Sequence, residues 1–153
     1  MADIIGGCLC GAVRYEVFQE PAQVVNCHCD DCRKETGAAF ATNVFFKADE
    51  FTVVKRTPKS FQHTADSGST MTKEFCGDCG SQLFGPSSRA GGMKSNKVGS
   101  KDDPFGVVAG LDIYISRKLP GVVLSDDTEH HEEMRPGKNR ALPCARQIRK
   151  IRV

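Results

Sequence analysis

The stretch "CLCGAVRYEV" at residues 8–17 joins a pair of cysteines to a run of alternating apolar and charged side chains. Val13, Tyr15 and Val17 fall on one face of this run, and the residues between them are charged, which is typical of a half-buried β-strand. Cysteines separated by a single residue can present two thiolates to one metal ion. The stretch therefore predicts a strand that begins beside a metal site.

Similar patterns recur along the chain and predict further strands at residues 39–46, 51–55, 60–64, 70–75, 81–85 and 111–116. Residues 30–37 are the best candidate for a helix, with Asp30 as its N-terminal cap and Gly37 as its end. Residues 86–104 are rich in Gly, Ser and Lys, so we expect a long loop there with at most one weak strand. Together the patterns predict a mainly β fold, a small single-domain antiparallel structure stabilised by zinc and with little helix, over residues 4–125.

Seven of the eight cysteines fall into three short clusters, at residues 8–10, 27–32 and 76–79, and Cys144 stands alone. Disulfides are rare in a reducing compartment, so metal binding is the leading use for so many cysteines. A structural zinc site is closed by four ligands, whereas a catalytic site keeps three protein ligands and an open position. Counting does not by itself settle which clusters join, but seven cysteines divide naturally into four and three.

The middle cluster is the natural three-ligand unit, because Cys27, Cys29 and Cys32 need no partner from elsewhere in the chain. By elimination the closed structural site would consist of Cys8, Cys10, Cys76 and Cys79. The alternatives are buried thiols or disulfides for the outer four, and an empty or easily oxidised cluster for the middle three. His28 could add a ligand, but in an extended segment its side chain points away from its two cysteine neighbours, which favours a role outside the ligand set.

The net charge of +2 hides an uneven distribution. Residues 135–153 carry 7 of the 21 basic residues and no acidic one, so the rest of the chain holds 14 basic and 19 acidic residues, a net charge of −5. We therefore expect no nucleic-acid binding except through this basic segment, and we predict a flexible tail over residues 126–153. No window approaches the ~18 apolar residues of a membrane span, and the first residues lack the basic region of a signal peptide. We expect a cytoplasmic, reducing location and no membrane partner.

Three stretches in this order, "GGCLCGAVRYEV", "CHCDDCRKETGAAF" and "FCGDCGSQLF", resemble the glutathione-dependent formaldehyde-activating enzyme family, which also includes centromere protein V. The resemblance covers about residues 6–125 and extends to "GSKDDP" at 99–104 and "IYISRKLPG" at 113–121. It implies a small, mostly β domain with one structural zinc on the first and last cysteine pairs. It also implies a second zinc, with an open position, on the middle cluster.

The resemblance implies a zinc-dependent carbon–sulfur lyase, similar to S-(hydroxymethyl)glutathione synthase, that handles an adduct between glutathione, or another thiol, and formaldehyde or a related aldehyde. Cys27, Cys29 and Cys32 would form the open catalytic site. Arg33 and Lys34 follow directly and could attract the carboxylates of a peptide-like thiol. The alternative is a non-catalytic, zinc-stabilised binding module that makes its contacts through the basic tail, like the centromere-associated relative.

Overall fold

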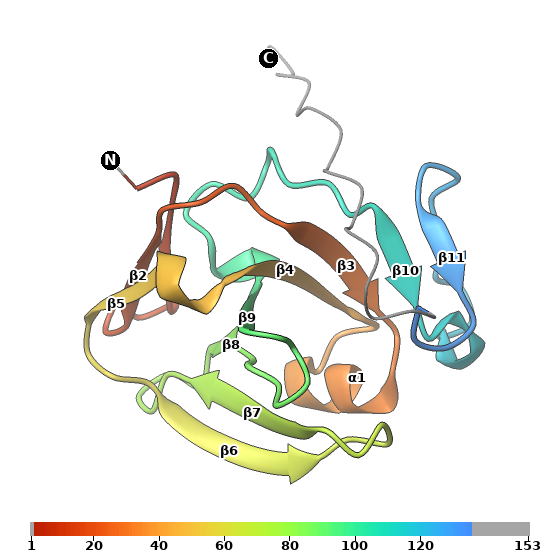
Figure 1. Ribbon diagram of the computed structural model, residues 1–153, viewed down its shortest axis with the longest axis horizontal. Helices are drawn as coiled ribbons and strands as arrows, with labels where there is room; N and C mark the ends of the chain where they lie inside the picture. The colour runs from red at the N-terminus through yellow and green to blue at the C-terminus, as the bar shows by residue number, and fades with distance from the viewer. Residues whose placement is uncertain (1, 136–153) are drawn as a thin grey trace.

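An eight-stranded sheet forms most of the computed structural model, which describes residues 2–135 (Figure 1). Its strand order is β11-β10-β3-β4-β9-β8-β7-β6. In chain order these strands are β3 Gln23–Cys27, β4 Ala41–Lys47, β6 Lys59–Thr64, β7 Thr70–Phe75, β8 Gln82–Phe84, β9 Met93–Lys97, β10 Leu111–Ile113 and β11 Glu129–His131. A smaller sheet consists of β1 Ile4–Gly7, β2 Arg14–Val17 and β5 Phe51–Lys55, with β2 in the middle. The prediction of a mainly β fold with little helix is confirmed.

The main core lies between the two sheets. Val13, Tyr15 and Val17, the apolar face predicted from residues 8–17, are all 0% exposed. They belong to one cluster with buried side chains of the large sheet, namely Val44, Phe46, Leu83 and Phe84. The rings of Tyr15 and Phe84 meet edge to face with their centroids 5.2 Å apart. The alternation of this stretch therefore places its apolar face in the core, because successive side chains of a strand point to opposite faces.

Helix α1, Asp30–Thr36, connects β3 to β4. It lies between these two strands and the β6–β7 hairpin (Figure 1). It ends at Gly37, whose φ of 67° is left-handed, as the glycine at this place predicts. The predicted N-terminal cap is wrong, because the sulfur of Cys29, rather than Asp30, accepts a hydrogen bond from the backbone N–H of Cys32. A cysteine of the middle cluster thus organises the first turn of the helix. In residues 2–135 we find no helix long and apolar enough to cross a membrane.

Strand β10 differs from the predicted antiparallel arrangement, because it runs parallel to both β3 and β11, while the other strand pairs are antiparallel. The predicted strand 111–116 is also too long. It stops at Ile113 because Tyr114 has a left-handed φ of 57°, and a 3-10 turn follows at Ile115–Arg117. Asp112, expected on a polar face, is 2% exposed.

Strand β11 extends the large sheet beyond residue 125, where we placed the end of the domain. Of the flexible tail predicted at residues 126–153, the part from residue 136 onward, with Cys144, lies outside the described residues. The sequence patterns also missed β1 and β3. Strand β9, in the segment expected to be mostly loop, lies between β4 and β8 in the large sheet.

Candidate functional site

The four outer cysteines meet at one place, although 66 residues separate Cys10 from Cys76. All four Sγ atoms lie within 4.8 Å of one another. The Sγ atom of Cys10 is 3.5 Å from that of Cys8 and 3.8 Å from that of Cys76. Four thiolates around zinc, each at a Zn–S distance of ~2.3 Å, would lie roughly 3.8 Å apart. The donor set and its spacing therefore fit a tetrahedral zinc ion.

Two turns hold these sulfurs in place. In the turn between β1 and β2, the backbone N–H of Val13 donates to Sγ of Cys8 at 3.2 Å. Ser81 connects this turn to the one between β7 and β8, because its Oγ accepts from the backbone N–H of Leu9 at 3.0 Å and lies 3.2 Å from Sγ of Cys79. The hydrogen bond from Ser81 lowers the pKa of Cys79 to about 6. The four-thiol cluster therefore joins the two sheets at a point where one sulfur ionises readily.

The three middle cysteines form a second cluster where β3 leads into α1, with their Sγ atoms within 4.8 Å of one another. Cys27 and Cys32 are buried and Cys29 is half-buried. The thiol of Cys27 donates to Sγ of Cys29 at 3.3 Å, which raises the pKa of Cys27 and lowers that of Cys29. Within residues 2–135 no fourth side chain of ligating type joins the group. Three sulfurs alone fit a metal ion that keeps one open position.

His28, between two of these cysteines, is directed elsewhere. Its ring is fully buried and Nε2 lies 2.7 Å from Oδ1 of Asp112 on β10. Its backbone N–H donates to the carbonyl of Ile113 at 3.0 Å. His28 therefore lies outside the sulfur cluster. Its two contacts attach the segment that bears the cluster to the neighbouring strand β10.

The two basic residues after Cys32 have different surroundings. The guanidinium of Arg33 donates to the backbone oxygens of His28 and Arg117 and pairs with Asp30. Lys34 instead lines an open groove beside α1. Lys34 is thus placed to meet a ligand in the groove, whereas Arg33 is engaged by the chain itself.

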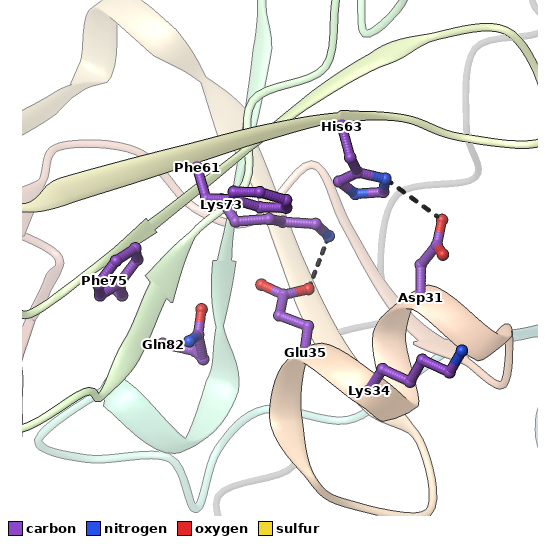
Figure 2. A pocket seen from close by; sticks show the side chains of 8 residues that line it. All are labelled: Asp31, Lys34, Glu35, Phe61, His63, Lys73, Phe75 and Gln82. Atoms are coloured by element: carbon purple, nitrogen blue, oxygen red, sulfur yellow. Dashed lines mark hydrogen bonds and ion pairs between the residues drawn. The ribbon is translucent and has the colours of Figure 1, made fainter.

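Eight residues line this groove: Asp31, Lys34, Glu35, Phe61, His63, Lys73, Phe75 and Gln82 (Figure 2). A second groove lies beside the four-thiol cluster, and its walls include Cys8, Cys79, Lys97 and Lys101. Glu35 and Gln82 line both grooves. The two hollows therefore meet at these two side chains.

Glu35 lies between two buried lysines. Its Oε2 accepts hydrogen bonds from Nζ of Lys73 at 2.6 Å and from Nζ of Lys97 at 3.3 Å. The side chains of Glu35, Lys73 and Lys97 are 6%, 9% and 11% exposed. Burial lowers the pKa of Lys73, but the hydrogen bond and charge of Glu35 outweigh it and raise that pKa. Lys73 therefore stays charged, close enough to Cys29 and Cys32 for its charge to favour their thiolates.

Glu35, Lys73 and Lys97 were missed in the sequence. Lys73 does carry a signal, because it shares one strand face with Met71 and Phe75 and so occupies an inward position of the predicted strand 70–75. Glu35 follows Cys32 by three residues and shares its face of the helix. Lys97 has no such signal, because its polar surroundings at residues 93–97 favour a loop.

Comparison with known proteins identifies related sequences and structures. The family model described as "Glutathione-dependent formaldehyde-activating enzyme" matches residues 3–117. A Halomonas elongata protein that carries the provisional name of glutathione-dependent formaldehyde-activating enzyme is 35% identical over 83 residues. That alignment takes in 52% of this chain and 53% of the relative, so the chain spans about half the length of this curated protein.

Among solved structures, the crystal structure of a Rhodobacter sphaeroides protein is similar with a TM-score of 0.51. The sequences are 23% identical, and the match covers 69% of this chain and 91% of the other. At that identity the likeness concerns the fold alone. The family match at residues 3–117, which takes in all seven clustered cysteines, shows that the chain belongs to the glutathione-dependent formaldehyde-activating enzyme family.

Proposed function

We propose that the protein is a zinc-dependent carbon–sulfur lyase-like enzyme that forms and cleaves the adduct of a thiol such as glutathione with formaldehyde or a related aldehyde. The observation that carries this proposal is the three-thiol cluster of Cys27, Cys29 and Cys32, which offers one ligand fewer than the four-thiol cluster. Zinc held by these three sulfurs would supply a positive charge that makes a thiol beside it more acidic. Zinc held by the other four would have a structural role.

The charged residues beside the cluster support an anionic thiol as substrate. Lys73 and Lys97 bring two positive charges to the cluster against the single negative charge of Glu35. Lys34 adds a cation at the groove, where it could attract a carboxylate of a peptide thiol such as glutathione. These charges favour a thiolate over a thiol, because a nearby cation stabilises the charged form.

In the proposed reaction the sulfur forms a bond to the aldehyde carbon, and the π electrons of the carbonyl move to its oxygen. That oxygen takes up the proton that the thiol has lost, so no oxidant or reductant is needed. In the lyase direction the same step runs backwards: the hydroxyl loses its proton, the carbonyl forms again, and the carbon–sulfur bond breaks to release the thiol. The chain's contribution is to hold the thiol as a thiolate near Lys73 and to bring the aldehyde next to it, which lowers the entropic cost of the encounter.

The test is the rate at which free glutathione and formaldehyde exchange with S-(hydroxymethyl)glutathione, measured by NMR exchange spectroscopy on protein purified under reducing conditions. We expect the wild-type protein to accelerate exchange over the buffer rate, and Cys27→Ser to abolish the acceleration while the circular dichroism spectrum is kept. Cys144→Ser is the matched control, because it makes the same change at a cysteine beyond the matched family segment, and it should behave as wild type.

Exchange at the buffer rate with zinc-loaded wild-type protein would refute the enzyme. The non-catalytic binding module would then be the better interpretation. That alternative depends on the basic segment 135–153, of which the structure describes Arg135 alone. For the enzyme we propose a cytoplasmic location, because its seven free cysteines in residues 2–135 suit a reducing compartment.

A further inference from the structure

A carboxylate oxygen on α1, the helix that carries Cys32 of the three-thiol cluster, has no hydrogen-bond donor within residues 2–135. It is Oε1 of Glu35, which is shielded from solvent, while Oε2 of the same carboxylate is shared by Lys73 and Lys97. A buried carboxylate oxygen without a donor is unfavourable. Because Glu35 lines both grooves, a ligand that enters them could supply the missing donor.

Helix α1 places this carboxylate next to the thiols. Glu35 follows Cys32 by three residues, so the two side chains lie on one face, roughly 4.5 Å apart along the helix axis. Lys73, which binds Oε2, also acts through its charge on Cys29 and Cys32. Figure 2 shows the other oxygen of Glu35 turned away from Lys73, toward the side of the groove that Gln82 lines. Gln82 itself has a buried Oε1 without a donor in the described chain.

A thiol of the cysteine type carries a donor that suits this place. In a cysteine residue the backbone nitrogen is separated from the sulfur by two carbon atoms, a reach comparable to the spacing of Cys32 and Glu35 along the helix. A sulfur bound at the cluster would therefore bring the N–H into the region of Glu35. Thiols that lack this nitrogen would leave Oε1 unpaired in the complex, which is the usual basis of strong discrimination by a buried polar group.

We propose that Oε1 of Glu35 accepts a hydrogen bond from the N–H of a cysteine-derived thiol, and that this contact makes the site selective for peptide thiols over thiols without a nitrogen at that position. The inference rests on the proposed function, since it places the thiol sulfur at Cys27, Cys29 and Cys32. Glu35 acts here as a substrate-binding residue and takes no part in bond making.

The experiment compares wild-type protein with Glu35→Gln, both zinc-loaded, by calorimetric titration with glutathione, N-acetylcysteine and 3-mercaptopropionate, which has no nitrogen. Lys73 and Lys97 would continue to donate to the amide oxygen of the new side chain, so its NH2 group would take the place of Oε1. The NH2 group would then face the N–H of the thiol, and two donors cannot form a hydrogen bond. We expect Glu35→Gln to raise the Kd of the two nitrogen-bearing thiols about tenfold or more and to leave that of 3-mercaptopropionate within about twofold. Zinc content per chain should equal that of wild type.

The matched control is Glu132→Gln, the same change at an exposed position, which should alter none of the three Kd values. An equal loss for all three thiols, or no loss for any, would overturn the proposal. If Glu35→Gln does not fold, the wild-type protein is titrated with N-acetylcysteine and its N-methyl analogue, which lacks the N–H. About tenfold weaker binding of the analogue supports the contact, and equal binding overturns it.

The proposed function and this inference can fail separately. Wild-type protein that binds thiols with the expected selectivity but leaves formaldehyde exchange at the buffer rate would refute the enzyme and leave the role of Glu35 standing. Wild-type protein that accelerates exchange equally with glutathione and 3-mercaptopropionate, and binds both equally, would refute the role of Glu35 and leave the enzyme standing. Wild-type protein that binds none of the thiols would refute both.

Discussion

Nε2 of His28 lies 2.7 Å from Oδ1 of Asp112, and the two side chains are 1% and 3% exposed. The contact joins the segment between Cys27 and Cys29 to β10, the parallel neighbour of β3. The remaining polar atoms, Nδ1 of His28 and Oδ2 of Asp112, have no hydrogen-bond partner in residues 2–135. Each side chain therefore depends on the other, and the pair fixes the three-thiol cluster to the sheet.

Removing one member of this pair should destabilise the fold. His28→Ala or Asp112→Ala leaves a buried polar group without its partner, which should lower the free energy of unfolding by about 3 kcal/mol. The double variant should lose less than the sum of the two, because neither unpaired group remains. Urea unfolding of the four proteins measures this coupling. Strictly additive losses would mean that the contact contributes nothing of its own.

The two thiol clusters should contribute differently to stability. Cys76 is 0% exposed in the four-thiol cluster, so we expect Cys76→Ser to release zinc and to lower the free energy of unfolding by more than about 3 kcal/mol. Cys29→Ser should release zinc from the other cluster at a cost of about 1 kcal/mol, since serine is itself a good helix cap. Elemental analysis and urea unfolding of both variants check this. Equal destabilisation would show that the three-thiol cluster is structural as well.

Lys101 should make stability depend on pH in the alkaline range. Its ammonium lies 5.7 Å from the centre of the Phe46 ring, and burial lowers its pKa from 10.5 to about 8. Between pH 8 and pH 10.5 the Lys101 side chain is therefore protonated to a greater extent in the unfolded chain than in the folded one. The contribution of Lys101 to the free energy of unfolding is therefore unfavourable below pH 8 and improves as the pH rises toward 10.5.

The difference between wild-type protein and Lys101→Met isolates this contribution, because the other titrating groups are common to both. At pH 7 the variant should be the more stable by up to about 3 kcal/mol. The advantage should shrink as the pH rises from 8 to 10.5. Urea unfolding at several pH values measures it, and a constant difference across this range would contradict the low pKa.

Gly6 of β1 lies close to Tyr15 of β2 and to the 3-10 turn at Val98–Ser100, and a side chain should not be tolerated there. A Cβ atom at this position would come 2.3 Å from the hydroxyl of Tyr15 and 2.4 Å from the backbone oxygen of Ser100. Gly6→Ala should therefore lower the free energy of unfolding by about 2 kcal/mol or more, because neither atom can move freely within the packed contact. Gly99→Ala is the matched control, since a Cβ atom there meets nothing within 4 Å. Similar melting temperatures for the two variants would contradict the close approach.

Local patterns predicted those parts of the fold that local chemistry controls. The alternation at Val13, Tyr15 and Val17 places all three in the core, because strand geometry alone decides which side chains share a face. Gly37 ends α1 because a left-handed residue is needed there. The grouping of seven cysteines into four and three follows from ligand count and from short spacings.

The pattern fails where a distant partner decides burial. Asp112 breaks the expected alternation of residues 111–116 because His28, which is 84 residues away, buries its carboxylate. Strand β9 looks like a loop in the sequence, yet Ser95, Asn96 and Lys97 are buried. Ser95 donates to the carbonyl of Gly85, and Lys97 donates to the side chain of Asn43. No local period marks such a strand, because its stability depends on polar partners from other segments.

Periodicity and ligand spacing are properties of neighbouring residues, so they predict the β architecture, the helix that follows the middle cysteines and the division of the thiols into two clusters. Which charged and polar side chains surround the three-thiol cluster depends instead on how distant segments pack. Glu35, Lys73, Lys97 and Asn43 come from α1, β7, β9 and β4. Burying such groups is unfavourable unless each meets a partner, and it is the packing of the helix on the sheet that brings these partners together.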